Sequence, residues 1–301
     1  GRYRRPRPAS RMNAQSPVDL HLHSTASDGM LDPAALVAHV ARCGVRLMAL
    51  TDHDTVAGVE AAAGAAREHG IAFVAGVELS AAWRGKALHV LGLAIDPSSP
   101  VLQHGLDGQQ ALREERAERI ASMLEAAGAP GRVALARIRA NGSLPTRTHF
   151  ARALVALGVA ADNGKAFDRW LGRGKPGHVG SAWPTLEAAT AWIVAAGGKA
   201  VIAHPMRYPL SAGARRELCT DFAAVGGRGI EVVTGGGSVR DREQAISLAV
   251  RCRLEGSVGS DFHDPAVPWN PPGRLAKLPR SVRPVWSDPP FPEFETDAEP
   301  A

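Results

Sequence analysis

The stretch VDLHLH, residues 18–23, alternates apolar and ionisable side chains. A strand has a side-chain period of two, so its apolar residues share one face and the other face carries Asp19, His21 and His23. Three ionisable groups on one buried strand face need partners, because burying them alone is unfavourable. Imidazole and carboxylate groups bind divalent metal ions, so the pattern raises metal binding as the chemistry of this segment.

The same residue types recur at or near the ends of later predicted strands. The carboxyl ends of strands form the active-site face of α/β barrels, so we expect these side chains to converge. Nine such donors are too many for one tetrahedral ion and suit two or three ions that share carboxylates. The neighbouring acids Asp19, Asp52 and Asp54 are expected to orient the ligand imidazoles. The candidate ligands are His21, His23, Asp28, His53, Glu78, His89, His204, Asp261 and His263.

The elements that would carry these residues alternate between strand and helix. Asp32 followed by Pro33 is typical of a helix start, and Gly44 ends that helix. The alternation stops over residues 103–195, which are mostly helical in pattern, and then resumes. This order predicts a mainly parallel sheet or barrel with a helical insertion. Strands are expected at residues 18–23, 46–54, 71–79, 86–95, 199–205, 229–233 and 255–263, with the third and fourth as a hairpin, and helices at residues 32–43, 56–70, 211–225 and 239–253.

Composition excludes several classes of protein. The chain has 301 residues, of which 45% are hydrophobic, and no apolar run approaches the length of a membrane span. The first residues lack the apolar core of a signal peptide. Cys43, Cys219 and Cys252 show neither metal-finger spacing nor a disulfide framework, so we expect a reducing cytoplasm. The basic excess is local, because the first 11 residues hold five arginines and the remainder has 30 basic and 30 acidic residues.

These patterns divide the chain into five segments. Residues 1–16 are expected to be a disordered basic leader, and residues 283–301, rich in proline and acidic residues, a flexible tail. The barrel is expected in two parts, at residues 17–102 and 181–282. Residues 103–180 between them are expected to form the helical insertion and to act as a substrate lid.

The motifs HLHS, SDG, TDHD, GVELS, HVLG, AHP and GSDFH occur in the order found in the PHP (polymerase and histidinol phosphatase) family, which residues 18–275 resemble. The resemblance implies an α/β fold, a distorted β/α barrel of seven strands, with a centre of three metal ions. It also implies a bridging role for Glu78. The three implied ligand sets are His21, His23, Glu78 and Asp261; Glu78, His89 and His204; and Asp28, His53 and His263.

Four segments resemble one branch of this family: RTHFARALVALG, KPGHV, AAGGKAVIAHPMRY and GSDFH. That branch removes the 3′-phosphate of nucleoside 3′,5′-bisphosphates and degrades short RNA from the 5′ end. Its members carry a helical insertion between the motifs of His89 and His204. The resemblance therefore implies a nucleotide or short RNA substrate, with a nucleoside 5′-monophosphate and phosphate as products. The chain departs from the branch at His178 and at the glycine run 235–237.

Hydrolysis of a phosphate ester needs a nucleophile at neutral pH, charge neutralisation and in-line geometry, all of which closely spaced cations supply. A donor set of imidazole and carboxylate without thiolate suits Mn²⁺, with Fe²⁺ and Zn²⁺ as alternatives. His204 or His263 is also expected beside the leaving group. The residues expected to act in catalysis are His21, His23, Glu78, His204, Asp261 and His263.

Substrate binding requires cations outside the ligand set. Arg147 and His149 begin an insertion helix, Lys175 lies in a glycine-rich loop, and Arg207 closely follows His204. A guanidinium group binds phosphate in a bidentate manner, so we predict that these residues contact the substrate. The alternative for Lys175 and Arg207 is a solvated surface cation.

Other interpretations stay open at this level. A histidinol-phosphate phosphatase would use the same fold and ligands. An amidohydrolase also begins with H-x-H, but that class uses a bridging lysine where this chain has Glu78. A non-catalytic metal-binding PHP module is the alternative from another class, and the complete donor set argues against it. No DNA-binding module is evident, and the oligomeric state stays open.

Overall fold

The computed structural model describes residues 15–267 and 270–294. The leader predicted at residues 1–16 therefore lies almost entirely outside the described residues. At the centre is a sheet of seven strands whose spatial order is the same as their order in the chain. The strands are β1 (Val18–Asp19), β2 (Leu47–Leu50), β3 (Ala72–Trp83), β4 (Lys86–Leu93), β5 (Lys199–Ile202), β6 (Gly229–Thr234) and β7 (Glu255–Gly259).

The sheet curls into a nearly closed barrel. Its two ends lie side by side, because the amide of Leu20 donates to the carbonyl of Val258 at 2.9 Å and Leu22 forms a bridge with Phe262. β4 runs antiparallel to both β3 and β5, and every other neighbouring pair is parallel. The antiparallel β4 distorts an otherwise parallel barrel. The fold class expected from the sequence is confirmed.

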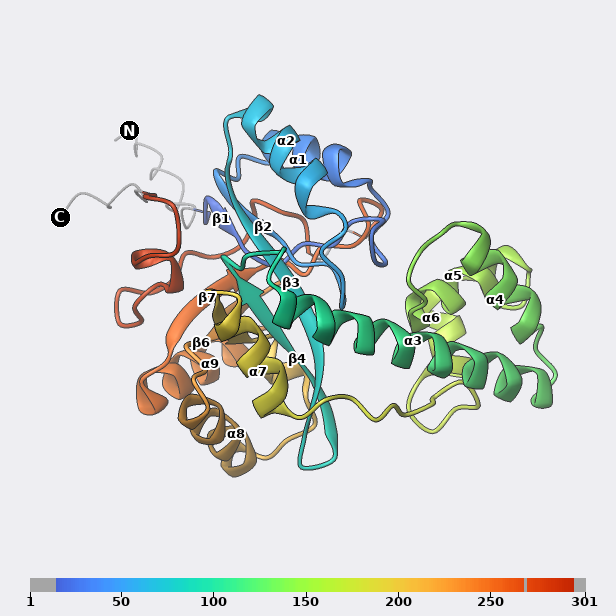
Figure 1. Cartoon of the computed structure of the whole chain (residues 1–301). Coiled ribbons are helices and arrows are strands. Elements are labelled where there is room, and N and C mark those ends of the chain that lie inside the picture. Colours follow the sequence, from blue (N-terminus) through green and yellow to red (C-terminus); the bar gives the residue numbers. More distant parts are fainter. Residues whose placement is uncertain (1–14, 268–269, 295–301) are drawn as a thin grey trace, which may run out of the picture.

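Helices pack around the outside of the barrel (Figure 1). The first begins as its sequence predicts, with the side chain of Asp32 accepting a hydrogen bond from the amide of Ala35 at 2.8 Å and with proline in the first turn. None of the helices in the described residues is long and apolar enough to cross a membrane. The surrounding helices are α1 (Pro33–Arg42), α2 (Val59–His69), α7 (Leu186–Ala195), α8 (Ala212–Ala224) and α9 (Val239–Cys252).

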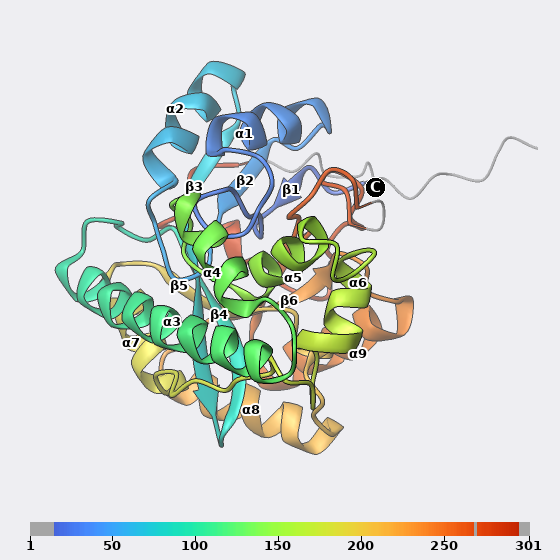
Figure 2. The same ribbon diagram turned by 90° about the vertical axis from the view of Figure 1, so that its right-hand side faces the viewer.

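The helical insertion is built on one long helix, α3 (Pro100–Ala126), that runs from the barrel outwards (Figure 1). Leu106 in its first half belongs to the core of the barrel, whereas Leu124 near its end packs in a separate hydrophobic cluster with Phe150. One continuous helix therefore connects two cores. Figure 2, viewed from the side of the insertion, shows α4 and α5 in front of the barrel strands. The remaining elements of the insertion are α4 (Gly131–Ala140), α5 (Arg147–Ala156), α6 (Asn163–Ala166) and a π-helical turn (Phe167–Leu171).

Several strands are shorter than predicted, among them β2, which ends at Leu50, and β5, which ends at Ile202. β1 ends at Asp19, although the alternating pattern continues to residue 23, and β7 ends at Gly259. Side chains replace the regular ladder here, since the amide of Leu22 donates to Oγ1 of Thr51 at 3.1 Å. The backbone of Asp261 has φ of 55°, which also ends regular strand pairing. The histidine-rich segments are thus extended connections held by side chains.

The segment after residue 282 differs from the flexible tail that its composition predicts. In the described part, residues 283–294, Val285 and Trp286 are buried in the barrel core. The ammonium of Lys199 donates to the carbonyl of Val285 at 2.7 Å, and the amide of Gly256 donates to the carbonyl of Arg283 at 2.8 Å. A few apolar side chains and these backbone contacts dock a segment whose proline and acid content suggests disorder.

Candidate metal centre

The barrel mouth brings the predicted ligands into one network of contacts. Glu78 on β3 lies at its middle and is fully buried. Its Oε1 is 2.9 Å from Nδ1 of His89 and 3.0 Å from Nε2 of His204. One carboxylate thus faces donors from opposite sides, as a bridge between ions would. Its Oε2 lies within 3.2 Å of a ring nitrogen of three further histidines: His21, His23 and His53.

Two histidines on the connection after β1 point the same type of atom at each other. Nε2 of His21 and Nε2 of His23 are 3.1 Å apart, and both rings are fully buried. Oδ1 of Asp261 lies 3.4 Å from the first of these nitrogens and 3.2 Å from the second. Two lone-pair nitrogens at this distance repel each other unless a cation or a proton lies between them. A metal ion shared by the two rings, or an N–H group of one ring, would satisfy both nitrogens at this point.

Hydrogen bonds on the far sides of two rings set their tautomers. Nδ1 of His21 donates to Oε1 of Glu231 at 2.9 Å, and Nδ1 of His263 donates to the backbone carbonyl of Asp261 at 2.9 Å. In each neutral ring the other nitrogen, Nε2, then carries the lone pair and faces the donor cluster. Nε2 of His263 lies 3.2 Å from Oδ1 of Asp28.

Donor atoms that lie within 4.8 Å of one another fall into three groups. The first is the expected set around His21. The set of Asp28, His53 and His263 gains His23 as a further member. The remaining group differs from the expectation, because His53 takes the place of His204 beside Glu78 and His89. The groups are His21, His23, Glu78 and Asp261; His23, Asp28, His53 and His263; and His53, Glu78 and His89.

His204 lies against Glu78 although it falls outside that group. Its backbone has φ of 29°, outside the usual regions for a residue with a side chain, at the point where β5 ends. Nε2 reaches Glu78, but Nδ1 is buried without a hydrogen-bond partner among the described residues. Asp54, with φ of 50°, and Asp261 share this left-handed conformation after the ends of β2 and β7. Such backbone strain is typical of sites where function fixes side-chain direction.

Several buried donor atoms at the centre are left without a hydrogen-bond partner in the described residues. They include Oε2 of Glu78, Oδ1 of Asp28, and Nδ1 of His53 and His89. Buried polar atoms in native proteins are almost always paired, so each such atom requires an explanation. A set of nitrogen and oxygen donors that converge without satisfying one another fits divalent metal ions. The residues present therefore match the chemistry that the sequence predicts.

The histidines and carboxylates of the centre shift one another's pKa values. Burial alone would raise the pKa of the Glu78 carboxyl, but attraction by neighbouring histidines holds it well below its usual range. Asp261 behaves in the same way for the same reason. Burial would lower the pKa of His23, yet hydrogen bonds to these two carboxylates raise it to about 10, whereas burial lowers the pKa of His53 to about 4. Binding of a cation would displace the shared protons.

One functional residue escaped the sequence interpretation. The strand predicted at residues 229–233 carries no predicted ligand. The structure shows it as β6, and its Glu231 is almost fully buried against the centre. This carboxylate accepts hydrogen bonds from Nδ1 of His21 and from the backbone amide of His204. It therefore fixes two candidate ligands at once. The available signal was a single acid inside an otherwise apolar buried strand.

The acids expected to orient imidazoles have a different role. Asp19 accepts from the amide of Ser260 at 2.8 Å, and Asp52 accepts from the amide of Ser24 at 2.8 Å. Asp54 accepts from the amide of Ser80 at 2.7 Å. These short side chains satisfy backbone amides that the ends of the strands leave unpaired. They brace the loops that carry the ligands, and Asp52 also accepts from the hydroxyl of Ser27, which lies 3.5 Å from Nδ1 of His23.

The predicted substrate-binding residues fall in different environments. Arg207 donates to the carboxylate of Asp261 and, at 2.9 Å, to the carbonyl of Gly235, so it lies directly against a candidate ligand. Arg147 and His149 begin α5, where the Nδ1 atom of His149 accepts from the amide of Thr146 at 3.2 Å. Lys175 lies in an exposed loop of the insertion after the π-helical turn, and its side chain forms no ion pair within the described residues. The structure thus brings Arg207 to the centre and leaves Lys175 on the surface.

Three arginines of the insertion were not predicted. Nε of Arg113 pairs with Oδ2 of Asp54 at 2.7 Å and is almost fully buried. Arg116, one turn later, donates from Nε to the carbonyl of Val179 at 2.8 Å. Burial, followed by repulsion from three nearby arginines, lowers the pKa of Arg116 to about 9. Nε of Arg152 is buried without a hydrogen-bond partner in the part of the chain that is described.

We use the name insertion cations for Arg116, Arg147, His149 and Arg152. His149 and Arg152 line a cleft of about 720 Å³ between the insertion and the loop that carries Asp28. That carboxylate opposes the effect of burial, which lowers the pKa of His149 and of Arg152. The insertion cations thus lie on the insertion side of the candidate metal centre.

A barrel whose strand ends gather histidine and carboxylate donors is the architecture of a metal-dependent hydrolase. The model of the PHP domain matches residues 19–137. A 5′-3′ exoribonuclease of Haemophilus influenzae is 44% identical over 89% of this chain and 97% of its own length. A 3′,5′-nucleoside bisphosphate phosphatase of Chromobacterium violaceum is 43% identical over 90% and 95% of the two chains. The chain belongs to the PHP family.

Solved structures agree with this assignment. An amidohydrolase from Chromobacterium violaceum, with bound sulfate and no metal, aligns with a TM-score of 0.85 at 43% identity over 90% of this chain and 95% of its own. A candidate metal-dependent phosphoesterase from Bifidobacterium adolescentis aligns with a TM-score of 0.75 at 28% identity over 89% and 92% of the two chains. The protein is a metal-dependent phosphoric ester hydrolase.

Proposed function

We propose that the protein hydrolyses the 3′-phosphate of nucleoside 3′,5′-bisphosphates, releasing a nucleoside 5′-monophosphate and phosphate, and that it degrades short RNA from the 5′ end in the same site. The relatives named for these two activities are 42–44% identical over about nine-tenths of the chain. The observation that carries the proposal is the group of insertion cations, which is separate from the metal centre. A simple phosphomonoester needs the metal centre alone, whereas a bisphosphate needs a cationic site for its other phosphate.

The insertion cations supply that second site. Arg116, Arg147 and Arg152 form no ion pair with a carboxylate among the residues described, in contrast to Arg113, which Asp54 neutralises. Like charges crowded at a partly buried position destabilise one another, and a phosphate dianion would relieve this repulsion. We therefore assign the 5′-phosphate to the insertion cations and the 3′-phosphate to the metal centre. In this account the insertion covers the substrate as a lid.

We further propose that the centre holds three divalent ions, with Mn²⁺ as the metal we expect and Fe²⁺ and Zn²⁺ as alternatives. Such ions supply neutralisation of phosphate charge and lower the pKa of water, which makes hydrolysis feasible at neutral pH. The chain's own residues position them. Glu231 holds the ring of His21, the backbone of Asp261 holds the ring of His263, and Arg207 keeps the Asp261 carboxylate in place. The free thiols fit a reducing compartment, so we expect the cytoplasm.

A comparison of substrates tests the proposal. Protein depleted of metal and reloaded with Mn²⁺ should release phosphate from adenosine 3′,5′-bisphosphate with a kcat/KM at least tenfold above that for histidinol phosphate. Metal-depleted protein should release none. Equal rates on both substrates would favour a general phosphomonoesterase. Metal binding without hydrolysis of either substrate would support the non-catalytic module. Elemental analysis of the reloaded protein checks the number of ions.

A further inference from the structure

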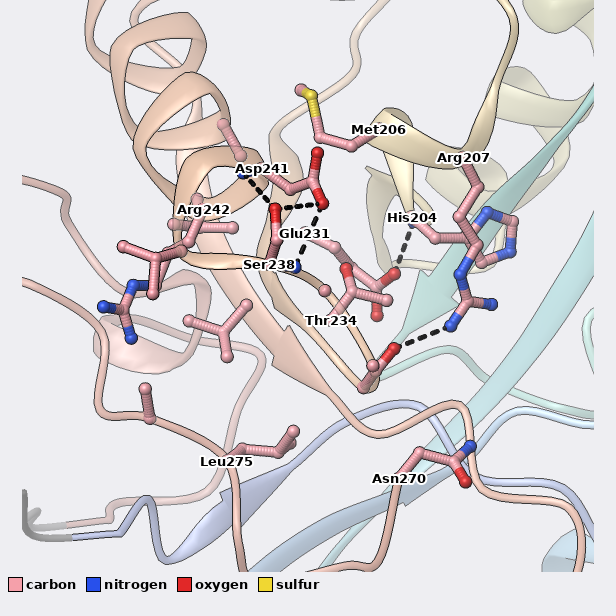
Figure 3. A pocket seen from close by; sticks show the side chains of 18 of the residues that line it. His204, Met206, Arg207, Glu231, Thr234, Ser238, Asp241, Arg242, Asn270 and Leu275 are labelled. Carbon is pink, nitrogen blue, oxygen red and sulfur yellow. Dashed lines mark hydrogen bonds between the residues drawn. The ribbon is translucent and has the colours of Figure 1, made fainter. Parts of the chain in front are cut away.

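A second cleft lies beside the metal centre, and none of its lining residues belongs to the insertion. It has a volume of about 530 Å³. Its walls are the segment after β5, the loop from β6 to the start of α9, and residues 270–276. Figure 3 shows Arg207 and His204 on one wall, Ser238, Asp241 and Arg242 on another, and Leu275 on the third. We name it the β6–α9 cleft.

The floor of the β6–α9 cleft is continuous with the metal centre. His204 and Glu231, which line it, also contact Glu78 and His21 respectively. Arg207 lines it as well while its guanidinium holds Asp261. A group bound in this cleft would therefore lie against His204 and Arg207, which contact Glu78 and Asp261 at the centre.

The walls combine the chemistry that a nucleotide needs. Arg242 and Arg274 form no ion pair with a carboxylate in the described residues, so they are available to a phosphate. The negative charge of Asp241 is engaged, because its carboxylate accepts from the hydroxyl of Ser238 at 2.6 Å and from its amide at 3.0 Å. The apolar side chain of Val239 is 63% exposed at the rim, where a base or ribose would pack.

The glycine run 235–237, where the chain departs from its branch, opens this cleft. Gly235 has no space for a Cβ atom, which would lie 2.0 Å from the carbonyl oxygen of Ser260. Gly236 has φ of 70°, a conformation that glycine adopts without strain. The run therefore turns the chain closely past the end of β7 before α9 begins, and it leaves no side chain in the entrance of the cleft.

A nucleoside bisphosphate and an RNA differ on one side of the scissile phosphate only. The bisphosphate ends there, whereas RNA continues through the 5′ oxygen of the next nucleoside. The insertion cations are assigned to the 5′-phosphate, which lies on the side of the scissile phosphate that both substrates share. We propose that the β6–α9 cleft binds the nucleoside that follows the scissile phosphate of an RNA substrate, together with the next phosphate on its 3′ side. The inference rests on the proposed function, and it gives the two activities separate determinants.

The reaction balances in both cases. Water adds its oxygen to phosphorus, the bond from phosphorus to the 3′ oxygen breaks, and that oxygen takes a proton. From a bisphosphate the phosphorus departs as inorganic phosphate. From RNA it stays on the next nucleoside as a 5′-phosphate, ready for another round. The nucleoside in the cleft is therefore the part of the substrate that keeps the phosphate.

Two substrates test this inference directly. Adenosine 3′,5′-bisphosphate and the adenosine dinucleotide phosphorylated at both its 5′ and 3′ ends differ only in the second adenosine and the phosphate that follows it. The double substitution Arg242→Ala with Arg274→Ala should lower kcat/KM for the dinucleotide about tenfold, the size expected for lost charged hydrogen bonds. The bisphosphate should change less than about twofold. Arg240→Ala, an exposed arginine of the same helix outside the cleft, is the matched control.

A steric variant gives an independent readout. Val239→Trp should obstruct the rim and lower kcat/KM of the Mn²⁺-loaded protein for the dinucleotide, while kcat/KM for the bisphosphate is retained. Val250→Trp, 52% exposed on α9 outside the cleft, is its control. Equal losses for both substrates, or no loss for either, would overturn the inference. So would a wild-type protein that hydrolyses the bisphosphate but not the dinucleotide. Failure on both substrates would instead contradict the proposed function.

Discussion

Nε2 of His21 lies 3.1 Å from Nε2 of His23, with a carboxylate oxygen of Asp261 within 3.4 Å of both. Because Glu231 holds Nδ1 of His21, the lone pair of that ring is directed at its neighbour. A shared cation, or an N–H group of the His23 ring, would satisfy both nitrogens. The pair therefore fits the edge of a metal site.

The first prediction concerns pH in metal-depleted protein. The pKa of His23 is raised to about 10, above the usual 6.5. A group whose pKa rises on folding stabilises the folded state fully below its unfolded pKa, and that stabilisation disappears as pH rises through the folded pKa. The free energy of unfolding, measured by urea denaturation, should therefore fall between pH 6.5 and about 10. The variant His23→Gln should show a shallower fall, and an equal fall would contradict the assignment.

The second prediction concerns the missed residue. Glu231→Gln keeps the size of the side chain but removes the charge that orients His21. Supports of this kind are worth about 10- to 100-fold in metal affinity or activity. We expect a loss in that range in Mn²⁺ affinity, measured by competition with a chelating dye. Glu243→Gln, on the exposed surface of α9, should retain wild-type affinity. An unchanged affinity in Glu231→Gln would mean that this carboxylate only supports the barrel.

The third prediction compares two carboxylates of the centre. Glu78→Gln should reduce kcat far more than Asp28→Asn. Both carboxylate oxygens of Glu78 contact ring nitrogens, and Glu78 belongs to two of the three donor groups. Asp28 belongs to only one of them. Removing a bridging carboxylate leaves adjacent cations less compensated. Equal turnover in the two variants would show that Glu78 does not act as a bridge.

The fourth prediction concerns specificity. Arg147→Ala should impair hydrolysis of adenosine 3′,5′-bisphosphate about 10- to 100-fold in kcat/KM, the equivalent of a charged hydrogen bond of about 1.5–3 kcal/mol. An aryl phosphate has no second phosphate, so its hydrolysis should change little. Arg132→Ala, exposed on α4, is the matched control. The same loss on both substrates would assign Arg147 to the reacting phosphate and contradict the lid role of the insertion.

Much of the site can be predicted from the sequence for two reasons. Side chains alternate along a strand, and the carboxyl ends of barrel strands form the active-site face. Alternation places His21 and His23 on one side of an extended segment, and the order of strands brings Glu78 to the same mouth. These inferences need no knowledge of side-chain packing. The prediction that His204 completes a group with Glu78 and His89 stays a prediction: both histidines contact Oε1 of Glu78, and His53 also lies beside Glu78 and His89.

Other features depend on contacts that no local pattern encodes. The pair of Arg113 and Asp54 joins the insertion to the barrel across 59 residues, so nothing near either residue indicates it. Trp286 follows a proline-rich stretch that suggests disorder, and it is buried only because the barrel offers an apolar surface to it. In the sequence, Glu231 is an isolated charge in an apolar strand. Its role becomes evident only from its contact with the ring of His21 in the structure.

Identification of the products from adenosine 3′,5′-bisphosphate tests the central claim most directly. Protein reloaded with Mn²⁺ should convert it to adenosine 5′-monophosphate and phosphate, because the insertion cations hold the 5′-phosphate while the 3′-phosphate lies at the metals. Chromatography against the two isomeric monophosphates separates the outcomes. Formation of adenosine 3′-monophosphate, or of both isomers equally, would contradict the account.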